Sequence, residues 1–193
     1  MLQQERKYFS PEEYLALEEA ADYKSEYYQG EIFAMVGAWA NHNRITRNVL
    51  IALERQFEGR PCEAFASDMR LLVQENGLYT YPDVMAICGR LEFAAGRTDT
   101  LTNPVVIVEV LSDSTQDYDR GGKFALYRAV ASLQDYVLID QYRVQVEHFH
   151  KLEDGRWIFQ EFTDPDAALS LASITVEIPI SRMYRKVDWE AAG

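Results

Sequence analysis

Two acidic residues stand where a metal-dependent hydrolase would hold its cation. Asp83 follows a Tyr-Pro pair at the end of an apolar segment, and Glu109 lies inside the apolar run of residues 104–111. Carboxylate oxygens suit Mg²⁺ or Mn²⁺, which usually keep one or two protein carboxylates, several waters and a substrate phosphate. The pair is therefore a candidate divalent-metal site.

Glu109 is informative because its neighbours along the chain are apolar and mostly β-branched. Such a run is typical of a strand covered on both faces. A buried carboxylate without compensation costs several kcal/mol, so Glu109 needs a cation, a basic partner or a raised pKa. A second interpretation stays open here: Asp83 caps a turn, and Glu109 forms a structural ion pair with Arg70 or Lys123.

The elements that must position these acids can be predicted from local patterns. Ser10 followed by Pro11 and two glutamates predicts a short N-terminal helix. Residues 23–28 and 31–36 flank Gln29-Gly30 and predict a hairpin. A longer helix should begin at Asn41 as its cap and end at residues 59–61, Gly-Arg-Pro.

The remaining elements alternate between strands and helices. In chain order we expect a hairpin of residues 63–73 and 78–88, the central strand 104–111, a helix over 117–130, a strand over 135–140, a hairpin of 144–149 and 157–162, and a short strand and terminal helix after Ile174.

A set of short motifs follows a fixed order from about residue 8 to residue 149. They are Ser25 to Ile32, His42, Asp68, Pro82-Asp83, Glu109 to Thr115, Asp119, Lys123, Tyr127 and Asp135 to Asp140. Their order and spacing resemble the PD-(D/E)xK nuclease superfamily and, more narrowly, the bacterial Uma-type endonuclease family, also catalogued as domain of unknown function 820.

The resemblance implies an α/β (α+β) fold with a restriction-endonuclease-like core, in which helices flank a mixed central β-sheet. The core would span about residues 41–141 of a single domain, 1–193. Residues 1–40 would add an N-terminal helix and hairpin, and residues 142–193 a C-terminal hairpin and tail. The implied activity is Mg²⁺-dependent hydrolysis of phosphodiester bonds, with DNA as the partner.

The resemblance also assigns roles. Asp83 and Glu109 would bind Mg²⁺ or Mn²⁺. Lys123 would replace the lysine that the superfamily pattern places at Leu111, and would stabilise negative charge or orient water. Four residues are supporting candidates, each with a structural alternative such as packing or capping: Glu26, His42, Asp68 and Tyr127.

The bulk composition sets limits on these expectations. The 193 residues suit one domain, and the absence of an N-terminal apolar region or a long apolar stretch predicts a soluble, cytoplasmic protein without membrane spans. Cys62 and Cys88 lack metal-site spacing, so we expect both to pack in the core rather than form a disulfide.

The formal charge of −12 disfavours broad attraction to nucleic acid. The only plausible phosphate-tracking stripe is Arg44, Arg47 and Arg55, which could equally be a solvated helix face. Two alternatives to a DNA endonuclease therefore stay open. One is an inactive binding or regulatory module, for instance a self-associating homodimer, and the other is a metal-dependent hydrolase of a small phosphorylated compound.

Overall fold

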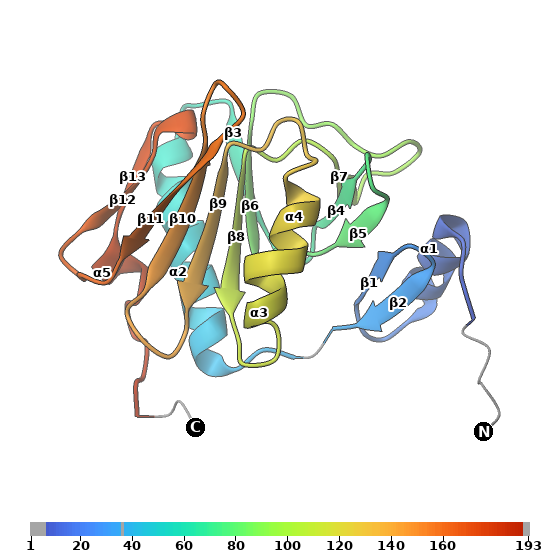
Figure 1. Cartoon of the computed structure of the whole chain (residues 1–193), viewed down its shortest axis with the longest axis horizontal. Helices are drawn as coiled ribbons and strands as arrows, with labels where there is room; N and C mark the ends of the chain where they lie inside the picture. Colours follow the sequence, from blue (N-terminus) through green and yellow to red (C-terminus); the bar gives the residue numbers. More distant parts are fainter. Residues whose placement is uncertain (1–6, 36, 191–193) are drawn as a thin grey trace.

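A six-stranded mixed sheet forms the centre of the computed structural model, which describes residues 7–35 and 37–190 (Figure 1). Its strands, in spatial order, are β11 (Trp157–Phe162), β10 (Val146–Lys151), β9 (Asp135–Asp140), β8 (Val106–Leu111), β6 (Val84–Cys88) and β3 (Cys62–Ala66). β8 and β9 are parallel, and the other neighbours are antiparallel. This mixed sheet confirms the predicted fold class.

Both faces of this sheet are covered. One face packs against helix α2 (Ala40–Phe57) and the C-terminal hairpin of β12 (Ala168–Leu171) and β13 (Val176–Pro179). The other face packs against a helical segment made of α3 (Gln116–Tyr118), the π-helical turn η1 (Asp119–Lys123) and α4 (Phe124–Tyr127). All six residues of β8 are buried, which confirms the predicted central strand.

A second sheet joins the N-terminal region to the core. Its order is β2 (Glu31–Ala34), β1 (Ser25–Tyr28), β5 (Leu78–Thr80), β4 (Arg70–Val73) and β7 (Thr100–Leu101). The hairpin predicted over residues 63–73 and 78–88 is therefore divided: β4 and β5 pair in this sheet, whereas β3 and β6 pair in the other. The chain passes between the sheets at Tyr81-Pro82-Asp83 because Pro82 has no amide hydrogen for a strand ladder.

The N-terminal helix α1 (Pro11–Ala20) forms as predicted. Ser10 and Glu13 make a capping box, in which the Glu13 amide donates to Ser10 Oγ at 3.2 Å and the Ser10 amide donates to Glu13 Oε2 at 2.7 Å. Tyr14 of this helix stacks on Tyr27 of β1. The predicted hairpin is also present, although Val36 at its end lies outside the described residues.

Helix α2 begins two residues earlier than predicted. Trp39 is its N-cap, and Asn41 lies inside the first turn, so the prediction that Asn41 caps the helix was wrong. The side chain of Asn41 is buried and donates to the carbonyl oxygen of Asp188 at 2.7 Å. The expected apolar row is confirmed, since Ile45, Val49 and Leu53 are all buried against the sheet.

Cys62 and Cys88 form a disulfide, which corrects the expectation that they only pack. They are directly opposed in the β3–β6 pair, so strand register brings the two sulfurs together. Sequence spacing alone cannot reveal that register. Both side chains also contact the hydrophobic core beneath α2.

The C-terminal region contains the predicted hairpin of β10 and β11. The tail supplies the expected short strand, β13, and a one-turn helix, α5 (Ile180–Met183). Strand β12 was not predicted; it is followed by the 3₁₀ turn η2 (Ala172–Ile174) and pairs with β13 over the core. Within residues 7–35 and 37–190, no helix is long and apolar enough to cross a membrane.

Candidate metal and catalytic site

Asp83 and Glu109 lie side by side at the junction of β6 and β8. The Asp83 amide donates to Glu109 Oε2 at 3.2 Å, and the Val110 amide donates to Asp83 Oδ2 at 2.8 Å. The antiparallel register, with Val84 opposite Val108, fixes these contacts through the main chain. The structure thus brings the two predicted metal-binding acids together.

Lys123 reaches this pair from η1. Its Nζ lies 3.0 Å from Glu109 Oε1, 3.1 Å from Glu26 Oε1 and 3.8 Å from Asp119 Oδ1. The lysine is 7% exposed, so its charge is shared among carboxylates rather than solvated. The cation comes from the helix after β8, where we expected it, and its catalytic role stays a prediction.

Burial sets the electrostatics of the cluster. It raises the pKa of Glu109 to about 8; the charges of Asp83 and Asp119 add to this rise, and Lys123 opposes it. Burial also raises the pKa of Asp119. Burial alone would lower the pKa of Lys123, but the surrounding carboxylates hold it well above its usual value. Three carboxylates, those of Glu26, Glu109 and Asp119, thus surround one lysine, and Asp83 lies beside Glu109.

Three further groups support the acids. His42, in the first turn of α2, places Nε2 3.1 Å from Asp83 Oδ2. The Tyr127 hydroxyl donates to Glu109 Oε1 at 2.7 Å, and the Thr80 hydroxyl donates to Glu26. The supporting candidates Glu26, His42 and Tyr127 therefore all reach the cluster.

Asp68 does not join them. Its side chain is 92% exposed in the turn between β3 and β4, where it pairs with Lys24. Arg70, the other basic partner considered for Glu109, instead donates to the Tyr81 hydroxyl at 2.9 Å. Asp119 was missed as a site residue, although its position four residues before Lys123 would place both on one helix face.

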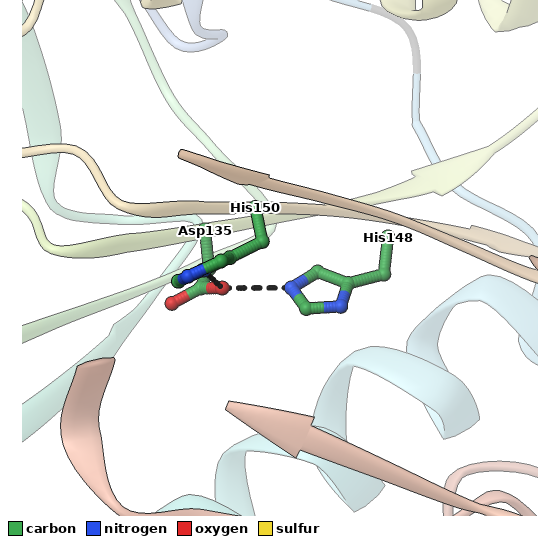
Figure 2. Close-up of side chains that lie close together, drawn as sticks. All are labelled: Asp135, His148 and His150. Atoms are coloured by element: carbon green, nitrogen blue, oxygen red, sulfur yellow. Dashed lines mark hydrogen bonds and ion pairs between the residues drawn. The ribbon is translucent and has the colours of Figure 1, made fainter. Parts of the chain in front are cut away.

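A second polar cluster lies at the other end of the sheet (Figure 2). Asp135 Oδ1 accepts hydrogen bonds from His148 Nε2 at 2.7 Å and His150 Nδ1 at 2.8 Å, and Asp135 Oδ2 accepts one from the Ser173 hydroxyl. Burial would raise the pKa of Asp135, but these hydrogen bonds outweigh it and the pKa is lowered. The sequence signal that we missed is the alternation of His148 and His150 on one face of a strand.

Among the described residues, only these three side chains bring three carboxylate or imidazole ligand atoms within 4.8 Å of one another. The donor set could hold a transition-metal ion. However, tetrahedral ligands at 2.0–2.1 Å from zinc lie about 3.3 Å apart, farther than the distances at Asp135. His148 Nδ1 is also buried without the acceptor that a metal-bound imidazole needs. The geometry fits a hydrogen-bond network that joins β9, β10 and η2.

Comparison with known proteins identifies the family to which this chain belongs. The model of the Uma2 family, described as "Putative restriction endonuclease", matches residues 11–181. The chain belongs to the Uma2 family. This confirms the resemblance to that family, and membership supports a nuclease-like function.

Two cyanobacterial proteins and one crystal structure are similar over nearly their whole length. The uncharacterized protein sll1609 of Synechocystis sp. is 41% identical over 170 residues, 88% of this chain and 96% of that protein. The uncharacterized protein slr1290 of the same organism is 38% identical over 176 residues, 91% of each chain. A putative nuclease of DUF820 from Anabaena variabilis has a TM-score of 0.75 at 19% identity, covering 92% of this chain and 98% of that chain. This last likeness shows the shared fold.

Proposed function

We propose that this Uma2-family chain is a divalent-metal-dependent endonuclease that hydrolyses DNA phosphodiester bonds at Asp83 and Glu109. The observation that carries the proposal is the charge of the site. Glu26, Glu109 and Asp119 lie within 4 Å of the ammonium group of Lys123, and Asp83 lies beside Glu109. Such an excess of carboxylates is relieved when a divalent cation binds.

The donor set fits Mg²⁺ or Mn²⁺. The Val110 amide hydrogen bond and the His42 contact both fall on Asp83 Oδ2, and none of the described residues hydrogen-bonds to Oδ1. Asp83 and Glu109 would hold the ion, and water and phosphate oxygens would supply its remaining ligands. When bound, the ion polarises the phosphate and lowers the pKa of an attacking water.

The remaining residues act on position and charge. Tyr127 and the Asp83 amide bind separate oxygens of Glu109 and hold its carboxylate in one orientation. The Val110 amide donates to Asp83 Oδ2 and His42 Nε2 lies 3.1 Å from the same oxygen, and these two contacts orient the Asp83 carboxylate. Lys123 is a fixed cation that stabilises negative charge developing on the phosphate oxygens.

Metal binding and cleavage test the proposal together. Mn²⁺ titration by calorimetry and plasmid cleavage are measured for wild type, Asp83→Asn and Glu109→Gln, with Asp68→Asn as a matched control for an acid outside the cluster. We expect Mn²⁺ binding and plasmid cleavage to be lost in the first two variants and unchanged in the control. Equal Mn²⁺ binding by wild type and Asp83→Asn would end the metal-site proposal.

A second candidate function is a nucleic-acid-binding module without catalysis. It is favoured by the ion pair of Lys123 with Glu109, which already compensates the buried acid, and by leucine at position 111. This candidate predicts that an oligonucleotide is bound but stays intact with Mg²⁺, Mn²⁺ or Co²⁺. Cleavage that is lost in Glu109→Gln excludes it.

A further inference from the structure

A cleft of about 480 Å³ opens at the end of the sheet where strands β8 and β9 finish, the end at which the acids lie. Its walls come from the start of α2 and from the turn after β9, among them Trp39, Arg44, Tyr142 and Arg143. In Figure 1, the start of α2 and the ends of β8 and β9 lie together at the bottom of the view.

Main-chain contacts connect this cleft to the candidate site. Gln141, in the cleft wall, donates from Nε2 to the Leu111 carbonyl oxygen at 2.9 Å. The preceding amide, that of Val110, donates to Asp83. His42, which contacts Asp83, also follows directly on the cleft residue Asn41. The cleft and the acids therefore lie at the same end of β8, joined through residues that are adjacent in sequence.

The aromatic residues of the cleft are unusually open to solvent. Trp39 is 73% exposed and Tyr142 is 38% exposed. Tryptophan is highly buried on average in folded proteins, so a ring as open as that of Trp39 is informative. Flat, exposed rings beside a phosphate-binding region are the groups on which unpaired bases stack.

The cationic groups of the cleft are few. Asn41 Oδ1 accepts a hydrogen bond from Arg44 Nη1 at 2.7 Å and holds that guanidinium in place. Arg143 is partly neutralised by Asp140, 3.1 Å from its Nε. Two arginines cannot neutralise the six to ten phosphates that a duplex-binding protein typically contacts. The formal charge of −12 opposes a duplex further.

We propose that the cleft binds an unpaired DNA strand beside the scissile phosphate, with bases stacked on Trp39 and Tyr142 and a neighbouring phosphate on Arg44. The proposal rests on the proposed nuclease function and narrows its substrate to single-stranded or locally opened DNA. Stacking supplies most of the binding in this arrangement, so a strongly acidic protein can bind nucleic acid with few cations.

A duplex would need a different surface. Basic residues farther along α2, on α5 and just after α5 line a smaller cleft of about 200 Å³; they include Arg55, Arg182 and Arg185. If these residues tracked a duplex, Arg55→Ala would weaken binding and Trp39→Ala would not. The two surfaces therefore predict opposite results from the same pair of variants.

The test is fluorescence anisotropy with a labelled mixed-sequence oligonucleotide, single-stranded or annealed, in EDTA so that nothing is cleaved. We expect tighter binding of the single strand, a loss of about 5- to 150-fold in Trp39→Ala, and a smaller loss in Arg44→Ala. Matched controls are Phe159→Ala, an aromatic residue 54% exposed on β11, and Arg156→Ala, whose side chain is 77% exposed; neither should change binding.

The salt dependence gives an independent measurement. Two neutralised phosphates on a single strand give a slope of log K against log salt of about −1.4, whereas duplex tracking gives about −5 to −9. Tighter duplex binding, a steep slope, or unchanged binding in both Trp39→Ala and Tyr142→Ala would overturn the inference. Binding without metal-dependent cleavage would instead contradict only the proposed nuclease function.

Discussion

Replacement of Lys123 by methionine tests the charge balance of the acid cluster. The substitution keeps an unbranched side chain of similar shape and removes an ammonium group that lies within 4 Å of Glu26, Glu109 and Asp119. Removal of one partner from a buried ion pair costs about 3–5 kcal/mol. For a chain of this length each kcal/mol lowers the Tm by about 2–4 °C, so we expect a fall of about 10 °C.

The size of this effect should depend on pH. Because the pKa of Glu109 is raised to about 8 and Lys123 opposes that rise, the variant must have a still higher pKa at Glu109. Below about pH 8 the folded forms of both proteins hold the Glu109 proton, so this carboxyl adds nothing to the difference between their free energies of unfolding. Above about pH 8 wild type loses the proton and the variant does not, so the destabilisation grows.

The free energy of unfolding of wild type and Lys123→Met is measured by urea denaturation followed by circular dichroism, at about pH 6 and about pH 9, in EDTA and with excess Mg²⁺. The control is Lys24→Met, because Lys24 pairs with the exposed Asp68 and should contribute at most about 1 kcal/mol. We also expect Mg²⁺ to stabilise Lys123→Met more than wild type. A loss below about 1 kcal/mol at about pH 9 would refute the charge balance inferred for the cluster.

Three other outcomes follow from the fold. Serine at both Cys62 and Cys88 should lower the free energy of unfolding by about 3.5 kcal/mol, since the crosslink joins residues 26 positions apart; an unchanged urea midpoint would count against this. Asp135→Asn should cost about 3 kcal/mol, because a buried ionised acceptor of three hydrogen bonds is lost; calorimetry should show a Tm lower by several degrees, and an unchanged Tm would argue against the network. Hydrogen bonds from Arg97 hold the pKa of Asp99 at about 2. Ionised Asp99 therefore adds to the free energy of unfolding, by about 1 kcal/mol or less after solvent screening; this contribution is present above about pH 4 and is lost as the pH falls through about 2. Asp99→Asn should remove this part of the acid dependence of stability, and identical pH profiles of the two proteins would contradict it.

The centre of the candidate site could be predicted because it violates a pattern. A carboxylate in a strand buried on both faces needs compensation, so Glu109 is conspicuous without any structure. Lys123 is less so: a lysine on a helix is ordinary, the pattern offered it only beside Arg70 as a possible ion-pair partner, and the resemblance to nucleases supplied its catalytic role. Asp68 matched the same motif set, yet the turn that carries it points to solvent.

Other features depend on pairings that no local pattern contains. The alternation of residues 63–73 and 78–88 is continuous, so it could not show that β4 and β5 leave the sheet that holds β3 and β6. The disulfide depends on the same register. Asp135 begins a strand whose apolar residues are accounted for by burial in the core, so the strand pattern does not draw attention to the acid. Its histidine partners come from a different strand.

The π-helical turn η1 makes the chemistry of the site depend on the number of residues as well as on their types. A π turn contains one residue more than an α turn, and one residue rotates a helix by about 100°. Deletion of Gly121 or Gly122 would give an α turn in which Asp119, three residues before Lys123, keeps the same face. Insertion of one residue between the two glycines would instead rotate Asp119 by about 100° away from Lys123 while Tyr127 stayed packed on the sheet. A single added codon between two glycines would separate an acid from its cation and leave every charged side chain of the chain present.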